Sequence, residues 1–121
     1  MRLAFLGSPS AAVPTLRALV RAGHDVALVV SGPDKRRGRG GARTPTPVKA
    51  AALELGLVVT DDLDAVAAAG VELGVVVAYG RIIPEALLMQ VPMVNLHFSL
   101  LPRWRGAAPV ERAILAGDIA T

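Results

Sequence analysis

The sequence predicts an α/β fold, a Rossmann-like doubly wound and mostly parallel sheet with helices on both faces. Two observations predict it. Short apolar runs alternate along the chain with stretches of helical periodicity, and several of those runs are apolar nearly throughout. Strands without a polar face are typical of parallel sheets that helices cover on both sides. The chain has 121 residues, of which 53% are hydrophobic, and this is enough to form a real core.

The first strand and helix occupy the opening of the chain. Residues 2–6 predict a short strand, and residues 7–10 predict a turn. Apolar residues then recur with helical spacing over residues 13–20. We expect Ser10 to be the N-cap of this helix and Gly23 to end it.

A long polar segment separates the second strand from the second helix. Residues 26–31 are an apolar, β-branched run and predict a strand. Residues 32–47 show no apolar period and predict a loop, and loops of this length are usually functional or disordered. Thr46 and Pro47 have the form of an N-cap followed by a proline at the first helical position, and Gly56 ends that helix.

The remaining elements follow the same alternation. Asp61 and Asp62 are expected to cap a helix that runs to residue 69 and stops at Gly70. Further strands are predicted at residues 57–59, 73–78 and 93–96, and further helices at residues 84–88 and 107–116.

Composition excludes several classes of site. The chain has no cysteine, which excludes disulfides, thiolate zinc sites and cysteine catalysis. No apolar run approaches the roughly 20 residues of a membrane-spanning helix, and no secretory signal precedes the first strand. We therefore expect a cytoplasmic protein without a membrane partner.

The fold class itself nominates a site, because open parallel sheets bind ligands outside the carboxyl ends of their strands. The segments that follow the strands are residues 7–10, 32–47, 79–84 and 95–105. The first of them reads Gly-Ser-Pro-Ser rather than the dinucleotide fingerprint, and Ser31 rather than an acid ends the second strand. A nicotinamide-dependent dehydrogenase is therefore disfavoured.

Three polar side chains share one face where the fifth strand ends. Asn95, His97 and Ser99 alternate with apolar residues, so an extended chain points them the same way. Histidine moves protons near neutral pH, and an asparagine amide can donate to a developing oxyanion. This set suits addition to a carbonyl with proton transfer. The alternative is a strand end whose polar groups only satisfy loop backbone.

Two other segments could form the rim of this site. In residues 79–84, Gly80 allows close approach of a flat ligand, and Ile82 and Ile83 could line a slot or simply pack beneath the loop. In residues 100–109, two arginines flank Trp104, which is consistent with an anion contact or with a solvated basic loop.

Five cations fall within nine positions without a carboxylate among them: Lys35, Arg36, Arg37, Arg39 and Arg43. The net charge of the chain is only +3, so this segment is a local concentration of positive charge. Glycine-interrupted arginines suit contacts to an RNA backbone, whereas a solvated charge run is the ordinary explanation.

The sequence resembles the methionyl-tRNA formyltransferases along essentially its whole length. The Asn-x-His…Ser-Leu-Leu-Pro core is typical of folate-dependent formyltransferases in general, and the Arg-Trp-Arg-Gly-Ala-Ala-Pro continuation and the basic insertion are typical of the tRNA-acting branch. The motifs that carry the resemblance are Gly7-Ser8-Pro9, Pro33-Asp34 with Gly38-Arg39-Gly40, Pro45-Thr46-Pro47-Val48-Lys49, residues 75–80 with Ile82-Ile83-Pro84, and residues 95–109.

The resemblance implies a donor, an acceptor and a role for each motif. The donor would be 10-formyltetrahydrofolate, the acceptor would be initiator methionyl-tRNA, and no metal is expected. Asn95 would hydrogen-bond the formyl oxygen, and His97 would transfer protons. The folate would contact Tyr79, Gly80, Arg81, Ile83, Leu88, Ser99, Leu100, Leu101 and Pro102. The five cations Lys35, Arg36, Arg37, Arg39 and Arg43 would bind the tRNA acceptor end.

The sequence also departs from the family pattern. Ser8 stands where threonine is usual, and Ser10 stands where an acid is usual. The family's catalytic aspartate and its C-terminal β-barrel domain match nothing in these residues. We expect residues 1–121 to be the N-terminal part of the catalytic domain, inactive alone, within a protein that is monomeric at full length. Two alternatives remain open: a formyltransferase for a small amine, such as an amino sugar nucleotide or glycinamide ribonucleotide, and a non-catalytic fragment.

Overall fold

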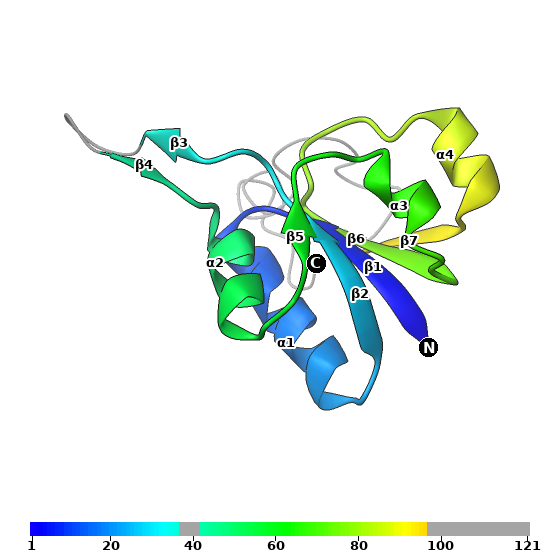
Figure 1. The fold of residues 1–121 in the computed structure, drawn as a ribbon, viewed down its shortest axis with the longest axis horizontal. Helices are drawn as coiled ribbons and strands as arrows, with labels where there is room; N and C mark the ends of the chain where they lie inside the picture. Colours follow the sequence, from blue (N-terminus) through cyan, green and yellow to red (C-terminus); the bar gives the residue numbers. More distant parts are fainter. Residues whose placement is uncertain (37–41, 97–121) are drawn as a thin grey trace, which may run out of the picture.

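The centre of the molecule is a five-stranded parallel sheet (Figure 1). The computed structural model describes residues 1–36 and 42–96. The strand order is β5-β2-β1-β6-β7, so the chain builds outward from β1 in one direction and then in the other. The predicted doubly wound parallel sheet is confirmed. The strands are β1 (Arg2–Gly7), β2 (Asp25–Val30), β5 (Val59–Thr60), β6 (Leu73–Val77) and β7 (Met93–Leu96).

Helices cover both faces of this sheet (Figure 1). On one face lie α1 (Val13–Arg21) and α2 (Pro47–Glu54), and on the other lie α3 (Ala65–Ala68) and α4 (Glu85–Gln90). A short 3-10 turn, η1 (Ser10–Ala12), leads into α1. Within the described ranges, no helix is both long enough and apolar enough to cross a membrane.

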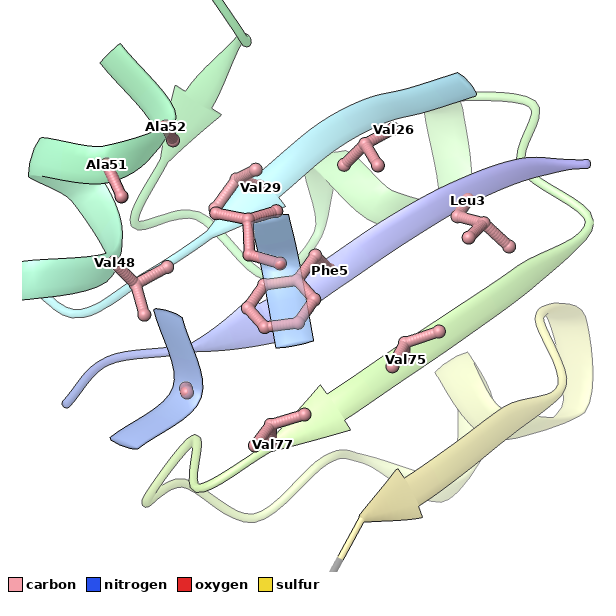
Figure 2. Close-up of a cluster of buried hydrophobic side chains, with 11 residues drawn as sticks. Leu3, Phe5, Val26, Val29, Val48, Ala51, Ala52, Val75 and Val77 are labelled. Atoms are coloured by element: carbon pink, nitrogen blue, oxygen red, sulfur yellow. The ribbon is translucent and has the colours of Figure 1, made fainter. Parts of the chain in front are cut away.

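Alternate strand residues form two separate cores. Leu3 and Phe5 of β1 pack under α1 and α2 (Figure 2), whereas Ala4 and Leu6 pack under α3 and α4. The register between β1 and β2 shifts after Leu3, and this irregularity places both Val26 and Val29 in the first core. All of these side chains are buried, which explains why the strands are apolar on both faces.

The glycines predicted to end helices do so. Gly23 adopts a φ of +85° after α1, and its amide donates to Val20 O at 3.1 Å. The next amide, that of His24, donates to Leu19 O at 3.2 Å, which completes a Schellman motif. Gly56 ends α2 in the same way with a φ of +72°. The Thr46 cap is also confirmed, because Thr46 Oγ1 accepts from the Lys49 amide at 3.1 Å.

The segment predicted as a loop over residues 32–47 contains a short hairpin that the sequence did not predict. Lys35–Arg36 (β3) pairs antiparallel with Arg43–Thr44 (β4), which makes a hairpin that projects away from the sheet (Figure 1). Thr44 Oγ1 also donates to Lys35 O at 3.3 Å. Lys35, Arg43 and Thr44 are exposed, which is consistent with the lack of an apolar period in the sequence. We call residues 32–45 the basic hairpin.

Four other predicted caps or boundaries need correction. Ser10 caps no helix, because it opens η1 and Ala12 occupies the N-cap position of α1. The strand predicted at 57–59 is Val59–Thr60, set by its pairing with Val29 and Val30.

The predicted helix from Asp61 to residue 69 is shorter in the structure. It is Ala65–Ala68, because the Asp62 carboxylate instead accepts from the Asp64 amide in a local turn. The helix predicted at 84–88 is Glu85–Gln90, and the one predicted at 107–116 lies outside the described residues.

Candidate functional site

A crevice of about 430 Å³ lies at the carboxyl ends of the central strands. It forms where the chain leaves β1 toward one side of the sheet and leaves β6 toward the other, which is the usual ligand position in doubly wound folds. Three of the four segments expected to meet there do so. Its lining comes from the turn after β1 (Ser8, Pro9, Ser10), from the basic hairpin and the start of α2 (Gly32, Pro33, Lys35, Thr46, Pro47), and from the segment after β6 (Tyr79, Gly80, Arg81).

The backbone packs closely at Gly7, which directly precedes the crevice residue Ser8. Gly7 is the last residue of β1 and pairs with Val77 of β6. A Cβ atom at position 7 would lie 2.6 Å from Val77 O and 3.2 Å from the Ala12 side chain. The two strands and η1 can therefore meet only where the side chain is a hydrogen atom.

Buried hydroxyl groups join the turn after β1 to the basic hairpin. The Ser31 and Thr46 hydroxyls lie 2.5 Å apart, and both residues are nearly inaccessible to solvent. The Gly32 amide donates to Ser8 Oγ at 3.1 Å, and the Val48 amide donates to Ser8 O at 3.2 Å. Ser8 thus binds the chain at Gly32, where the hairpin begins, and at Val48 in α2, just after the hairpin ends.

The segment after β6 has an unusual backbone. Ala78 adopts a φ of +50°, in the left-handed region that non-glycine residues rarely occupy, and Gly80 has a φ of +83°. Continued strand alternation after Val77 would place Tyr79 in the core under α1 and α2. The left-handed residue breaks that alternation, and Tyr79 instead packs in the core under α3 and α4. Its hydroxyl is buried without a hydrogen-bond partner among the described residues.

The other expected folate contacts that can be placed differ in exposure. Gly80 and Arg81 line the crevice and are exposed. Ile83 is half-buried against the core under α3 and α4, whereas Leu88 on α4 is 44% exposed. Ser99, Leu100, Leu101 and Pro102 lie outside the described residues.

Asn95 lies at the carboxyl end of β7, where its register partner on β6 is Val76. Its side chain is exposed, as a group that contacts a ligand must be. The segment after β6 begins two residues beyond Val76, so Asn95 is one strand away from the crevice rim. His97, the expected second catalytic group, lies outside the described residues.

Some of the expected tRNA-binding cations lie in the described part of the chain, and others lie outside it. Lys35 and Arg43 are exposed on the two strands of the basic hairpin, and Lys35 also lines the crevice. Arg36 lies on β3, whereas Arg37 and Arg39 fall outside the described residues. Nearby, Lys49 Nζ pairs with the Asp34 carboxylate at 2.8 Å.

A second hollow, of about 320 Å³, lies toward β5. It shares Gly32 and Pro33 with the crevice, and apart from Val59 its other lining residues are polar and include the Asp34–Lys49 pair and Asp61. In residues 1–36 and 42–96, no three side chains of metal-binding type gather closely enough to hold an ion.

Comparison with known proteins assigns the family. The sequence pattern of the formyl transferase family matches residues 1–121, which is the whole chain. The chain belongs to the formyl transferase family. The resemblance that the sequence motifs indicate is therefore confirmed at the level of the family.

Curated relatives of this formyl transferase chain carry a more specific name. The methionyl-tRNA formyltransferase of Heliobacterium modesticaldum is 53% identical over 127 residues, which cover 98% of the chain and 40% of that protein. The methionyl-tRNA formyltransferase of Clavibacter sepedonicus is 52% identical over 130 residues, which cover 100% of the chain and 43% of that protein. The formyl transferase chain thus spans about two fifths of the length of these relatives.

Solved structures confirm the formyl transferase fold. Glycinamide ribonucleotide transformylase 1 from Geobacillus kaustophilus superposes with a TM-score of 0.71 at 24% identity, covering 96% of the chain and 68% of that structure. Phosphoribosylglycinamide formyltransferase from Bacillus halodurans gives a TM-score of 0.74 at 21% identity, covering 96% and 66%. At this identity the likeness concerns the fold alone.

Sequence reasoning missed one feature of this formyl transferase site, the contact between Ser31 and Thr46. Ser31 drew notice only because no acid ends β2, and Thr46 only as a helix cap. Both residues border a segment rich in glycine and proline, and this position was the one feature of the sequence that could have drawn attention to them. Their contact could not be read from spacing, because it depends on the hairpin bringing residues 15 positions apart together.

Proposed function

We propose that this chain is the N-terminal part of a methionyl-tRNA formyltransferase catalytic domain. The native-length protein would transfer a formyl group from 10-formyltetrahydrofolate to the amino group of initiator methionyl-tRNA. The observation that carries this choice of acceptor is the basic hairpin, which projects from the crevice rim with Lys35 and Arg43 exposed (Figure 1). A small amine offers no extended anionic surface for such a hairpin to bind, whereas an RNA backbone does.

The proposed chemistry is addition to a carbonyl followed by elimination. The amine nitrogen of the methionyl group attacks the formyl carbon, and a new C–N bond forms while the carbonyl oxygen becomes an oxyanion. The Asn95 side-chain amide donates a hydrogen bond to that oxygen. His97 takes the proton from the attacking amine, the bond to folate N10 breaks, and the proton is delivered to N10.

The folate is proposed to bind along the segment after β6. Exposed Gly80 and Arg81, half-buried Ile83 and partly exposed Leu88 are available to it, together with Ser99, Leu100, Leu101 and Pro102. We expect Tyr79 to contribute its backbone, because its ring packs in the core under α3 and α4. No metal takes part in this mechanism, and the 121-residue chain is proposed to be inactive alone.

Substitution of Asn95 tests the reaction. In the native-length gene product, Asn95→Ala should lower kcat for formylation of methionyl-tRNA by about 10²- to 10³-fold, because one oxyanion donor is removed. The acceptor KM should change little. The matched control is Val94→Ala, since Val94 is also exposed on β7 but faces the opposite side of the sheet. Equal rates for the two variants would contradict the role of Asn95.

A further inference from the structure

The direction of the basic hairpin is set at its base. Each of its described strands pairs only two residues, Lys35 with Thr44 and Arg36 with Arg43. An isolated two-stranded hairpin is marginally stable in water, and this one projects away from the sheet rather than packing on it (Figure 1). Contacts where the hairpin leaves the sheet must therefore hold its orientation.

Ser31 and Thr46 occupy those two departure points. Ser31 follows β2 directly, and Thr46 directly precedes α2. Only 2% of Ser31 and 4% of Thr46 are exposed, and their hydroxyl oxygens lie 2.5 Å apart. They are the buried polar residues of the described core, and each is satisfied in part by the other.

The surrounding bonds make this pair the centre of a small network. Thr46 Oγ1 also accepts from the Lys49 amide, and Ser8 accepts from amides at the start of the hairpin and just after its end. The ion pair between Asp34 of the hairpin and Lys49 of α2 also joins these two elements. If the hairpin tilted, the Ser31 and Thr46 hydroxyls would separate inside the protein, where an unsatisfied polar group is strongly disfavoured.

We propose that the Ser31–Thr46 pair is a clamp that fixes the direction in which the basic hairpin leaves the crevice rim. Both are then positioning residues for the macromolecular acceptor, and neither touches the reacting atoms. The clamp also holds part of the crevice wall, because Thr46 itself lines that cavity together with Gly32 and Pro47, which adjoin the pair along the chain. This inference rests on the proposed function, in which the hairpin binds tRNA.

Ser31→Ala in the native-length gene product is the informative variant. It removes one hydroxyl of the pair and leaves the Thr46 cap on the Lys49 amide intact. Thr46→Ser keeps both the cap and the clamp hydroxyl, and it should behave like the native protein. The matched control for general destabilisation is Gly56→Ala, which strains the opposite end of α2, where φ is +72° and no neighbour would touch the new Cβ.

Two readouts separate positioning from stability. Ser31→Ala should raise the KM for methionyl-tRNA about fivefold, because it removes the bond to Thr46 and the longer 3.5 Å bond to Ser8 Oγ, with kcat and the folate KM unchanged. Hydrogen–deuterium exchange should become faster in peptides that contain Gly32, and it should stay unchanged at Lys49, whose cap by Thr46 remains. Gly56→Ala should change neither the acceptor KM nor exchange at Gly32.

The outcomes decide between the alternatives. A raised acceptor KM and faster exchange in Ser31→Ala, with Thr46→Ser near native, would support the clamp. Unchanged values in Ser31→Ala, or equal changes in Ser31→Ala and Gly56→Ala, would overturn it. Exchange could be faster in Ser31→Ala than in the native protein while the native protein formylates no methionyl-tRNA. That result would support the clamp and contradict the proposed function.

Discussion

At the scale of single residues, two backbone positions shape the crevice. Gly7 lets β1, β6 and η1 meet, and Ala78 turns the chain so that the segment after β6 reaches the crevice while Tyr79 enters the core. Both positions act through the backbone. Neither therefore stands out in a sequence as a catalytic side chain does.

Gly7→Ala should lower the free energy of unfolding of the native-length protein by about 1–3 kcal/mol, as overpacking does. The new Cβ would overlap Val77 O at 2.6 Å, and a backbone atom cannot move aside as a flexible side chain can. Urea denaturation measures the change. Gly32→Ala is the control, because its Cβ would meet Ser8 Oγ at an ordinary 3.5 Å. A tolerated Gly7→Ala would contradict the close packing of the two strands.

Ala78→Gly should instead raise the free energy of unfolding. A non-glycine residue in the left-handed region is strained by roughly 1 kcal/mol, and glycine removes that strain. We expect the urea midpoint to rise. The same substitution at Ala50, inside α2, should lower it, because glycine destabilises a helix by about 1 kcal/mol. If both substitutions lower the midpoint alike, the backbone at Ala78 is not strained.

At the scale of elements, burial explains which parts of the fold could be predicted from the sequence. The strands β1, β2, β6 and β7 were placed within one or two residues because apolar runs and flanking turns define them. The strand β5 was placed too early because its position depends on pairing with Val29 and Val30 rather than on its own pattern. The hairpin was missed because β3 and β4 hold together through backbone pairing and not through a buried apolar pattern that a sequence could reveal.

The basic hairpin should dominate the salt dependence of acceptor binding. Neutralising Lys35, Arg36, Arg37 and Arg39 together should weaken tRNA binding and flatten the plot of log affinity against log salt. For every phosphate that the variant no longer neutralises, the slope should fall by about 0.7–0.9. Fluorescence anisotropy of labelled tRNA across a salt series measures both quantities.

Single substitutions provide the matched comparison for that experiment. Lys35→Ala removes an exposed cation at the crevice, and Arg21→Ala removes an exposed cation at the far end of α1. Only Lys35→Ala should reduce the slope of log affinity against log salt. Equal slopes for the two variants would mean that the hairpin is an ordinary solvated charge run.

At the scale of the whole molecule, the topology predicts the place of the site better than its details. The expectation that segments after the strands converge follows from parallel pairing, and the crevice brings three of them together. The Ser31–Thr46 contact and the inward turn of Tyr79 could not be predicted. The first needs a hairpin to close, and the second depends on one left-handed residue.

The acceptor is the central claim, and a formyl-transfer assay on the native-length gene product tests it most directly. The donor is 10-formyltetrahydrofolate, and the acceptors, offered separately, are methionyl-tRNA and glycinamide ribonucleotide. Formylation of methionyl-tRNA, without transfer to glycinamide ribonucleotide, is the predicted result. Transfer to glycinamide ribonucleotide without formylation of methionyl-tRNA would contradict the account and leave the basic hairpin without a function.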